Sequence, residues 1–311
     1  MSDTALSMRI DIGICTFRRP ELKAALLSLA MVDVPAGICL RVIIADNDQT
    51  PSAQPLVNGL LPHLPWPVVY VHCPAGNISI ARNACLDNSD ADYLAFMDDD
   101  ETATEGWLTQ LVTIATETKA DAVLGPVHAG YHDSAPEWMR KGDFHSTFPV
   151  FVKGEIRTGY TCNVLLNLRS AHLLGMRFNL ALGKTGGEDT EYFTHIHRSG
   201  GTIAYAPEAL LYEAVPRQRA RFEWLAKRRY RMGQTHGRLV ADGAGAFARI
   251  KSLIITAAKA AFCFIAALLV VFAPIRRNRF VLRGILHVGA LSGILGFREI
   301  HQYGSLEAVS P

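Results

Sequence analysis

Short apolar runs alternate with segments of helical periodicity through the first two-thirds of the sequence. The runs are rich in Val, Ile, Phe and Tyr, as buried strands are, and the segments between them repeat apolar residues every three or four positions. We expect strands at 9–17, 39–47, 67–73, 91–100 and 121–129, and helices at 20–32, 77–88 and 106–118. This alternation predicts a parallel sheet covered by helices, with ligands at the carboxyl ends of the strands.

The pattern weakens after residue 130 and then resumes. Residues 130–160 are rich in Gly, Pro and aromatic residues, which indicates a loop or insertion beside the ligand site. Trp138 and His145 in this segment either line an acceptor cleft or pack within the loop, and both readings stay open. A strand at 161–168, a glycine-rich loop with a helix at 186–200, and an extended segment at 202–215 follow.

After Pro216 the sequence becomes basic and then strongly apolar. The stretch "RQRARFEWLAKRRYRMGQ" interleaves basic and aromatic residues, as helices at membrane interfaces do; a solvated helix on the body of the protein is the alternative. Residues 252–275 are apolar over a length that can span a bilayer, whereas residues 280–297 are shorter and contain Arg283 and His287. A helical hairpin, a single span, an in-plane helix and an apolar docking helix all fit this pattern.

Charge follows the same division. The chain has 311 residues, of which 49% are hydrophobic, and this excludes a disordered chain. Residues 1–216 hold 15 Lys/Arg against 25 Asp/Glu, a balance of −10, whereas residues 217–283 hold 15 against 2, a balance of +13. A basic, apolar tail predicts contact with anionic lipid and argues against nucleic acid. Scattered cysteines without metal-ligand spacing, and no recognisable signal sequence, predict a cytoplasmic body.

The expected strand at 91–100 ends in an acidic cluster, "FMDDDE". Adjacent carboxylates repel one another and are costly to remove from water, so a cation among them would explain their presence. Side chains alternate along a strand, which puts Asp98 and Asp100 on one side and Asp99 on the other. Such a pair suits Mg²⁺ or Mn²⁺, which commonly bridge to substrate phosphates. An acidic turn without metal is the simpler alternative, and Asp99 is either structural or in contact with a sugar.

Further charged residues follow at the ends of neighbouring elements. Asp46 ends the second expected strand, "GNISIARN" contributes Arg82 and Asn83, and "GGED" contributes Glu188 and Asp189. With the aspartates they offer a metal pair, a cation for a diphosphate and a spare carboxylate. Each also has an ordinary explanation: Asp46 caps a turn, Arg82 pairs with a nearby aspartate, and the two acids of "GGED" favour a helix N-terminus.

This ordered set of motifs resembles the inverting glycosyltransferases of family 2, which have the GT-A fold. "DIGICTFRRPE" resembles the family's first strand and turn, "FMDDD" its DxD metal motif, and "GGEDTEY" its ED motif. The likeness covers residues 8–215, and within the family it is nearest to bacterial succinoglycan-type exopolysaccharide enzymes. It implies an α/β fold with a Rossmann-like mixed sheet flanked by helices.

The resemblance also implies a role for each matching residue. Asp189 is the catalytic base, with Glu188 beside it in the ED motif. The residues expected to hold the nucleotide-sugar are Thr16, Arg18, Asp46, Asn77, Arg82, Asn83, Asp98 and Asp99. The residues expected to hold Mg²⁺ or Mn²⁺ are Asp98, Asp100 and Glu213. Many family members have a histidine where this chain has Glu213, so this residue is either a substitute oxygen ligand or the sign of a different metal shell.

The expected organisation is a GT-A domain at 8–216, a basic amphipathic region at 217–250 and membrane-associated apolar helices at 251–297. The expected activity is metal-dependent transfer of a sugar, glucose by resemblance alone, from a UDP-sugar to a lipid-linked oligosaccharide. It would occur on the cytoplasmic face of a bacterial inner membrane. A sugar-phosphate nucleotidylyltransferase is a rival, although "CTFRRP" lacks the glycines that such enzymes need. A catalytically silent membrane scaffold is another, and the oligomeric state stays open.

Overall fold

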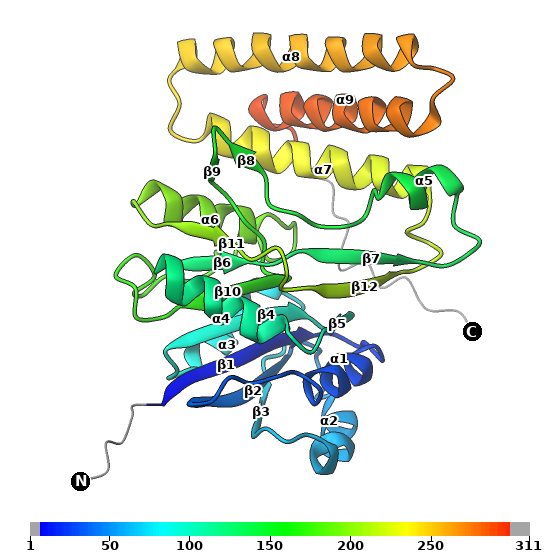
Figure 1. The fold of residues 1–311 in the computed structure, drawn as a ribbon. Helices are drawn as coiled ribbons and strands as arrows, with labels where there is room; N and C mark the ends of the chain where they lie inside the picture. Colours follow the sequence, from blue (N-terminus) through cyan, green and yellow to red (C-terminus); the bar gives the residue numbers. More distant parts are fainter. Residues whose placement is uncertain (1–6, 299–311) are drawn as a thin grey trace. The chain divides into compact units, whose positions relative to one another are not determined.

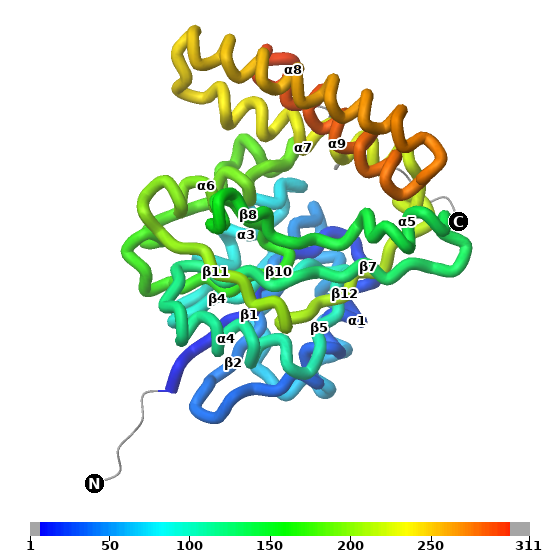
Figure 2. Tube along the Cα trace, turned by 45° about the horizontal axis from the view of Figure 1, so that its top comes forward, coloured from blue at the N-terminus to red at the C-terminus, as the bar shows by residue number. Residues whose placement is uncertain are grey.

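The protein divides into two units, which we describe separately. The structure is a computed structural model that describes residues 7–298 (Figures 1 and 2). The first, called the sheet unit, contains the described residues up to 130 together with 146–184 and 188–214. The second, called the helical unit, contains 131–145, 185–187 and the described residues from 215 onward.

A seven-stranded sheet with the order β11-β6-β10-β4-β1-β2-β3 forms the centre of the sheet unit. The strands are β1 Met8–Thr16, β2 Ile38–Asp46, β3 Val68–His72, β4 Tyr93–Asp98, β6 Ala122–Leu124, β10 Asn163–Asn167 and β11 Ile203–Tyr205. Strands β1 to β4 are parallel, and their register places Thr16 beside Asp46 and Cys15 beside Asp98. The carboxyl ends of β1, β2 and β4 therefore meet, as the sequence predicts.

The sheet is mixed, because β10 runs antiparallel to both of its neighbours, β4 and β6. The mixed sheet that the family resemblance implies is thus confirmed, whereas the parallel sheet predicted from the alternation alone is wrong for this strand. A parallel return needs a crossover connection, usually a long helix. Between β6 and β10 the chain has only one short helix, α5 Glu137–Gly142, and short strands that include the hairpin of β8 Phe151–Val152 and β9 Glu155–Ile156.

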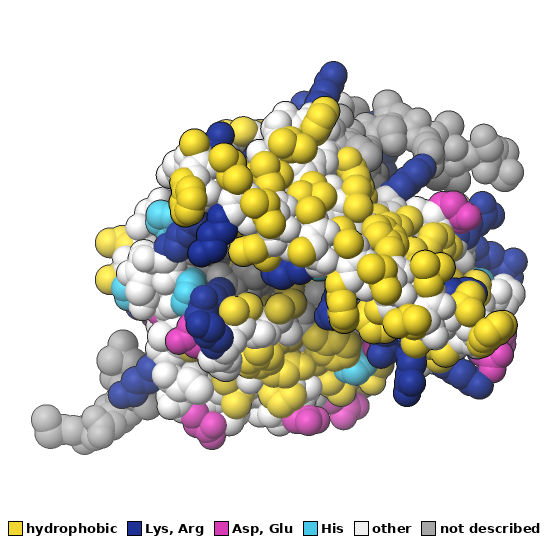
Figure 3. All heavy atoms as spheres, turned by 90° about the horizontal axis from the view of Figure 1, so that it is seen from above, with side chains coloured by type: hydrophobic (Ala, Val, Ile, Leu, Met, Phe, Trp, Pro, Cys, Tyr) yellow, Lys and Arg dark blue, Asp and Glu magenta, His cyan; other side chains and the backbone are white. Residues whose placement is uncertain are grey.

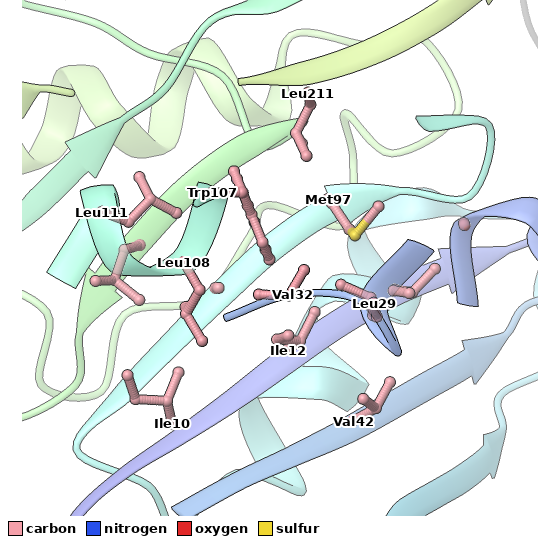
Figure 4. Close-up of a cluster of buried hydrophobic side chains, with 14 of the residues drawn as sticks. Ile10, Ile12, Leu29, Val32, Val42, Met97, Trp107, Leu108, Leu111 and Leu211 are labelled. Carbon is pink, nitrogen blue, oxygen red and sulfur yellow. The ribbon is translucent and has the colours of Figure 1, made fainter. Parts of the chain in front are cut away.

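Helices cover both faces of this sheet and enclose two apolar cores. The first core lies under α1 Leu22–Leu29, α2 Gln54–Leu60 (followed by the short 3₁₀ helix η1 Leu61–His63) and α4 Trp107–Thr118. Figure 4 shows Ile12, Val42, Met97 and Trp107 meeting there. The second core lies under α3 Ile78–Asp87 and α6 Glu188–Arg198. Because side chains alternate along a strand, Met97 points into the first core while its neighbour Phe96 points into the second.

A small second sheet, β5-β12-β7, continues from the end of β4. Its strands are β5 Glu101–Ala103, β12 Leu211–Val215 and β7 Val127–Tyr131. The expected strands at 121–129 and 202–215 are thus each two strands in different sheets, interrupted at Pro126 and Pro207, which cannot donate to a sheet ladder. The buried Asn163 fixes both interruptions: its amide nitrogen donates to Pro126 O and Ala209 O, each at 2.8 Å.

The helical unit contains three long helices, α7 Phe222–Ala241, α8 Ala246–Leu269 and α9 Pro274–Ile294. Helix α9 packs against both α7 and α8, which touch each other little (Figures 1 and 2). Helix α5 lies by the starts of α7 and α9: the Trp138 ring is 6.3 Å from the Phe222 ring, and Arg279 Nη2 donates to Gly142 O at 2.8 Å. His145 is buried and stacks on Trp224 at 5.3 Å. Of the two readings of Trp138 and His145, the structure shows packing within the helical unit.

Glycines set the close approach of α7 and α9. A Cβ at Gly289 or Gly293 of α9 would clash with the carbonyl oxygens of Tyr230 and Gln234, respectively, and one at Gly237 of α7 would clash with Ala290 O. The contacts advance along both helices in the same direction, so α7 and α9 are parallel. Paired small-xxx-small motifs of this kind bring two backbones into direct contact.

Candidate active site

The acidic cluster lies where β4 ends. β4 ends at Asp98, Asp99 and Asp100 form a turn, and Glu101 begins β5. The strand alternation expected to align Asp98 with Asp100 therefore stops at Asp98. Asp99 is buried, whereas Asp98 and Asp100 keep partial exposure. Glu101 is also buried, and its Oε2 accepts a hydrogen bond from the Asp98 backbone nitrogen at 2.8 Å.

Asp98 and Asp99 hold their protons unusually tightly. Removal from water is the main reason that the pKa of Asp98 is raised to about 7; Arg82 opposes this rise, and the charges of Asp100, Glu213 and Asp189 add to it. Burial and the Asp100 charge likewise raise the pKa of Asp99 to about 7. These carboxylates thus share one electrostatic environment, and their joint ionisation is unfavourable without a cation.

The second sheet brings Glu213 to this cluster. In the pairing of β12 with β5, Glu213 lies opposite Glu101. Its charge contributes to the raised pKa values of both Asp98 and Glu101. Glu213, more than a hundred positions away in the sequence, is therefore part of the same acidic site. Glu101 is a further buried acid of this site, which the sequence analysis did not single out.

The donor chemistry of the cluster suits a divalent cation. Carboxylate oxygens are the ligands that Mg²⁺ and Mn²⁺ prefer, and the raised pKa values show that positive charge would be stabilised here. Within residues 7–298, no three His, Cys, Asp or Glu side chains are already arranged around a common point as a metal site. The chain thus offers a partial shell, which substrate phosphates commonly complete for such ions.

A buried ion pair joins α3 to the start of α6. Arg82 Nη1 donates to Glu188 Oε1, and both residues are nearly inaccessible to solvent. Burial opposes the charge of Arg82, but the carboxylates of Glu188 and Asp189 raise its pKa overall. Glu188 Oε2 is buried and has no hydrogen-bond partner among the residues that the structure describes. It is therefore an acceptor for which the described residues supply no donor.

Asp189 differs from Glu188 in its surroundings. It is partly exposed at the first turn of α6, and its Oδ1 accepts a hydrogen bond from the Thr190 backbone nitrogen at 2.6 Å. Its charge acts on both Asp98 and Arg82, so it faces the acidic cluster. Of the two acids of the ED motif, Asp189 is thus the one that a substrate can reach.

Asn77 and Asn83 bind the segment that leads to α6. Asn77 caps α3 by accepting from Ser79 N at 3.0 Å, and its amide nitrogen donates to Leu180 O at 2.9 Å. Both ends of the Asn83 amide bond the backbone of Phe178, at 2.9 and 2.8 Å. The groups expected to touch a nucleotide-sugar are thus engaged within the chain, where they hold residues 178–183 and position the ED motif.

Asp46 is completely buried at the end of β2. Its carboxylate accepts hydrogen bonds from Asp48 N at 3.0 Å, Ala53 N at 2.9 Å and Tyr70 Oη at 2.6 Å. It therefore fixes the loop at 47–53. The structure thus shows the turn-capping role that the sequence analysis gave as the ordinary explanation for Asp46. Direct contact with a nucleotide base stays a prediction.

Basic residues border this loop. Arg18 pairs with Asp48 through two contacts, at 2.9 and 2.8 Å, and the Arg18 guanidinium lowers the pKa of Asp48 to about 2. Arg19 Nη1 lies 3.4 Å from Asp100 Oδ2. Thr16 is buried at the end of β1, and its carbonyl oxygen accepts from Asn47 N at 2.9 Å. A cavity of about 190 Å³ opens beside them, lined by Arg18, Arg19, Pro20, Ser52, Ala53 and Leu56.

Besides Glu101, the sequence analysis did not predict Arg19 and Asn47 as residues of this site. Arg19 directly follows Arg18 in "CTFRRP", and its contact with Asp100 depends on the turn after β4. Asn47 follows Asp46, and its side chain bonds the backbone of Asn77 in both directions. Their only sequence signal is adjacency to a motif residue.

A mixed sheet of this order, with buried carboxylates where β4 ends and a reachable acid at the start of α6, has the layout of a GT-A nucleotide-sugar transferase. Residues 11–180 match the model of the family described as glycosyl transferase family 2. The chain therefore belongs to glycosyltransferase family 2, and the rival assignment as a nucleotidylyltransferase falls away.

Known proteins are similar to this one over nearly the full chain. The chain is 58% identical over 304 residues to the succinoglycan biosynthesis protein ExoM of Rhizobium meliloti (strain 1021), covering 98% of both sequences. The mannosyltransferase PcManGT from Pyrobaculum calidifontis, solved with GDP-Man and Mn²⁺, matches with a TM-score of 0.61 and 18% identity over 92% of this chain and 87% of that one. TarS of S. aureus matches with a TM-score of 0.51 and 15% identity over 91% of this chain; this chain spans 52% of TarS. The two solved structures show a shared fold.

Proposed function

We propose that this glycosyltransferase transfers a sugar, with inversion, from a UDP-sugar to a lipid-linked oligosaccharide during assembly of a succinoglycan-type exopolysaccharide. The observation that carries the proposal is the partly exposed Asp189 facing the carboxyls of Asp98 and Asp99, whose pKa is raised to about 7. The pathway rests on the 58% identity to ExoM. Glucose as the transferred sugar rests on that likeness alone.

The acidic cluster forms the donor side of the site. A bound Mg²⁺ or Mn²⁺, held by Asp98 and Asp100 with Glu213 beside them, would neutralise the charge that grows on the departing UDP. Arg19, which pairs with Asp100, lies where its guanidinium can exchange that carboxylate for a phosphate. The cavity beside Arg18 and Arg19 is placed to receive the nucleoside, and Asp46 holds the loop that forms its wall.

Asp189 serves as the general base in this proposal. It takes the proton from the acceptor hydroxyl, whose oxygen then forms a bond to the anomeric carbon as the bond to UDP breaks. Glu188 is unsuited to that task because Arg82 holds its carboxylate in a buried ion pair. Its unpartnered Oε2 is instead suited to accept a hydrogen bond from a sugar hydroxyl. Arg82 thus positions the ED motif, and direct contact of Arg82 with the diphosphate stays a prediction.

The helical unit would keep the enzyme at the cytoplasmic face of the bacterial inner membrane, where a lipid-linked acceptor is found. Its strong excess of basic residues and the apolar α8 support this part of the proposal. In this view the C-terminal helices serve to bring the active site close to its acceptor.

The decisive experiment supplies labelled UDP-sugars to the purified protein with staged lipid-linked intermediates. We expect one UDP-sugar to label one intermediate, a requirement for Mg²⁺ or Mn²⁺ that a chelator removes, and opposite anomeric configurations in donor and product. Transfer that persists in chelator would contradict the metal assignment, and retention would contradict direct displacement. No transfer with any donor or intermediate would favour the membrane scaffold.

A further inference from the structure

Helix α8 presents an apolar face that no other described element covers. Of the residues described, only α8 is long and apolar enough to cross a membrane, and 17% of its apolar window is buried. A core helix would be largely buried. Its large apolar side chains that are more than half exposed are Phe247, Ile250, Ile254, Phe262, Ile265, Leu268 and Leu269. Figure 3, which views the molecule from above Figure 1, shows hydrophobic side chains gathered over this helix with Lys and Arg beside them.

The opposite side of α8 carries small buried residues, Ala260, Cys263 and Ala267, which pack against α9. Lys259, the one charged residue after Ser252 in this helix, stands about 100° round from Ala260. Lys259 is exposed, and this spacing puts it at the border between the buried side and the outward face. The outward face is therefore apolar along most of the helix.

We propose that α8 lies in the plane of a membrane surface, with its outward face in the lipid and without crossing the bilayer. This inference rests on the membrane attachment proposed above and specifies its form. Of the arrangements that the sequence leaves open, it selects the in-plane helix over the hairpin and the single span.

Both ends of α8 are connected to chain that has not crossed a membrane. Its start follows α7 directly, and α7 is too polar to span a bilayer. Its end leads through residues 270–273 into α9, where Arg279 bonds Gly142 O at 2.8 Å. Gly142 belongs to residues 131–145, which join the sheet unit at 130 and 146. Two ends held on one side exclude a crossing.

The contact between α7 and α9 leads to the same conclusion. Glycines fix these helices side by side and parallel, so α7 must follow any movement of α9. If α8 and α9 crossed as a hairpin, the start of α7, with Lys227, Arg228 and Arg229, would enter the hydrocarbon. Charged residues are strongly disfavoured there. An in-plane α8 leaves these residues at the headgroup level, where they are stabilising.

Charge favours anionic lipid over a second copy of the chain as the partner of this face. Residues 217–283 carry 15 Lys/Arg against 2 Asp/Glu. A twofold contact would bring the same basic surface of each copy together, and like charges would repel. A membrane with anionic headgroups supplies both a complementary charge and an apolar interior.

The test combines vesicle flotation with depth measurement on the full chain. Trp replaces Phe247, Ile254 or Leu269, which lie at the start, near the middle and at the end of α8 and are 83, 65 and 81% exposed. Each variant is mixed with vesicles of phosphatidylglycerol and phosphatidylcholine whose chains are brominated at different depths. The quenching is measured relative to the wild-type chain, and Met31→Trp in the sheet unit serves as the exposed reference.

We expect the chain to float with anionic vesicles, less so in high salt, and all three α8 variants to be quenched most by the same shallow bromine position. A graded series, deepest at Ile254→Trp, would overturn the in-plane arrangement while leaving membrane attachment intact. Flotation without quenching in any of the three would show that another surface binds lipid and overturn the assignment of this face. No flotation of the wild-type chain would instead overturn the membrane attachment itself. A dimer that forms through α8 without lipid would also overturn the proposal.

Discussion

Two groups of buried acids lie close together in the sheet unit, and they are neutralised differently. Glu188 is paired with Arg82 inside the chain. Asp98 and Asp99 form no ion pair with any Lys or Arg of residues 7–298, and their pKa is raised to about 7. Glu188 therefore has its counter-charge within the chain, whereas Asp98 and Asp99 leave a place for the cation proposed above.

This difference separates a structural role from a ligand-binding one. A carboxylate that the fold needs for its own stability has its counter-charge built in, as Glu188 has. A carboxylate that holds a substrate cation either lacks a counter-charge, as Asp98 does, or has one that can move to a substrate phosphate, as Asp100 has in Arg19. Asp189 stands between the groups, since it faces both but is exposed enough to meet an acceptor.

The largest effect is expected from Asp189→Asn. Loss of the general base should lower kcat by roughly 10²- to 10⁴-fold, while UDP binding stays near the wild-type value. Labelled-sugar transfer and calorimetric UDP titration measure the two quantities. The matched control is Glu191→Gln, which changes an acid two positions further along α6 and should transfer normally. Normal turnover in Asp189→Asn would move the base elsewhere and remove the distinction drawn here between Asp189 and Glu188.

Glu188→Gln tests the buried ion pair of Arg82 and Glu188. It leaves the Arg82 charge buried without a counter-charge, so the free energy of unfolding should fall by about 3–5 kcal/mol in urea titrations. Glu137→Gln breaks an exposed pair with Lys141 and should change the stability little.

A double variant, Arg82→Met with Glu188→Leu, separates stability from function. It should recover much of the lost stability, because apolar side chains can replace a buried ion pair. It should not recover transfer, because Asp189 loses its positioning and Oε2 is gone. A stable and fully active double variant would show that the pair is dispensable for catalysis.

Asp98→Asn tests the group formed by Asp98 and Asp99. It should raise stability and lower activity. Removing one of several repelling carboxylates should raise the free energy of unfolding in chelator by about 1–2 kcal/mol. Transfer and Mn²⁺ binding should both weaken. Destabilisation by this substitution would mean that Asp98 has a structural partner and that the two acidic groups are alike.

Much of the site's location follows from the sequence, because periodicity alone brings the ends of β1, β2 and β4 together and places Asp46 and Asp98 there. Helices α3 and α6 are likewise predicted at 77–88 and 186–200, and the structure shows both. What local pattern cannot show is pairing. The antiparallel direction of β10 appears only in its pairing with β4 and β6. The break of 121–129 into two strands is fixed by the buried Asn163, whose partners are distant in sequence.

The same limit applies to the roles of polar residues. From the sequence, Arg82 and Asn83 are predicted to contact the nucleotide-sugar, and Glu188 to belong to the catalytic motif. Only the fold shows that Arg82 and Glu188 neutralise each other and that Asn83 bonds Phe178, ninety-five positions away. Long-range partners decide whether a polar group of a motif is left for a substrate, and these partners have no local signature.

The smallest expected effect is a pH dependence of the free energy of unfolding that arises from Asp98 and Asp99. Asp98 and Asp99 have a pKa of about 7 in the folded chain and near the ordinary aspartate value when unfolded. Between about pH 4 and 7 the folded state therefore binds more protons than the unfolded state. Stability must then decrease as the pH rises through this window, and the decrease ends above pH 7.

This decrease should be seen in chelator, be smaller in Asp98→Asn, and be opposed by Mn²⁺ with UDP, which bind the ionised carboxylates. The thermal-unfolding shift produced by Mn²⁺ and UDP should consequently grow between pH 5 and 8. Glu188→Gln should leave the difference between wild type and Asp98→Asn largely unchanged, because its own partner is Arg82. A ligand-induced shift that is the same at every pH would mean that the cluster is already ionised in the free chain, and the cation would then have no unfavourable charge to relieve.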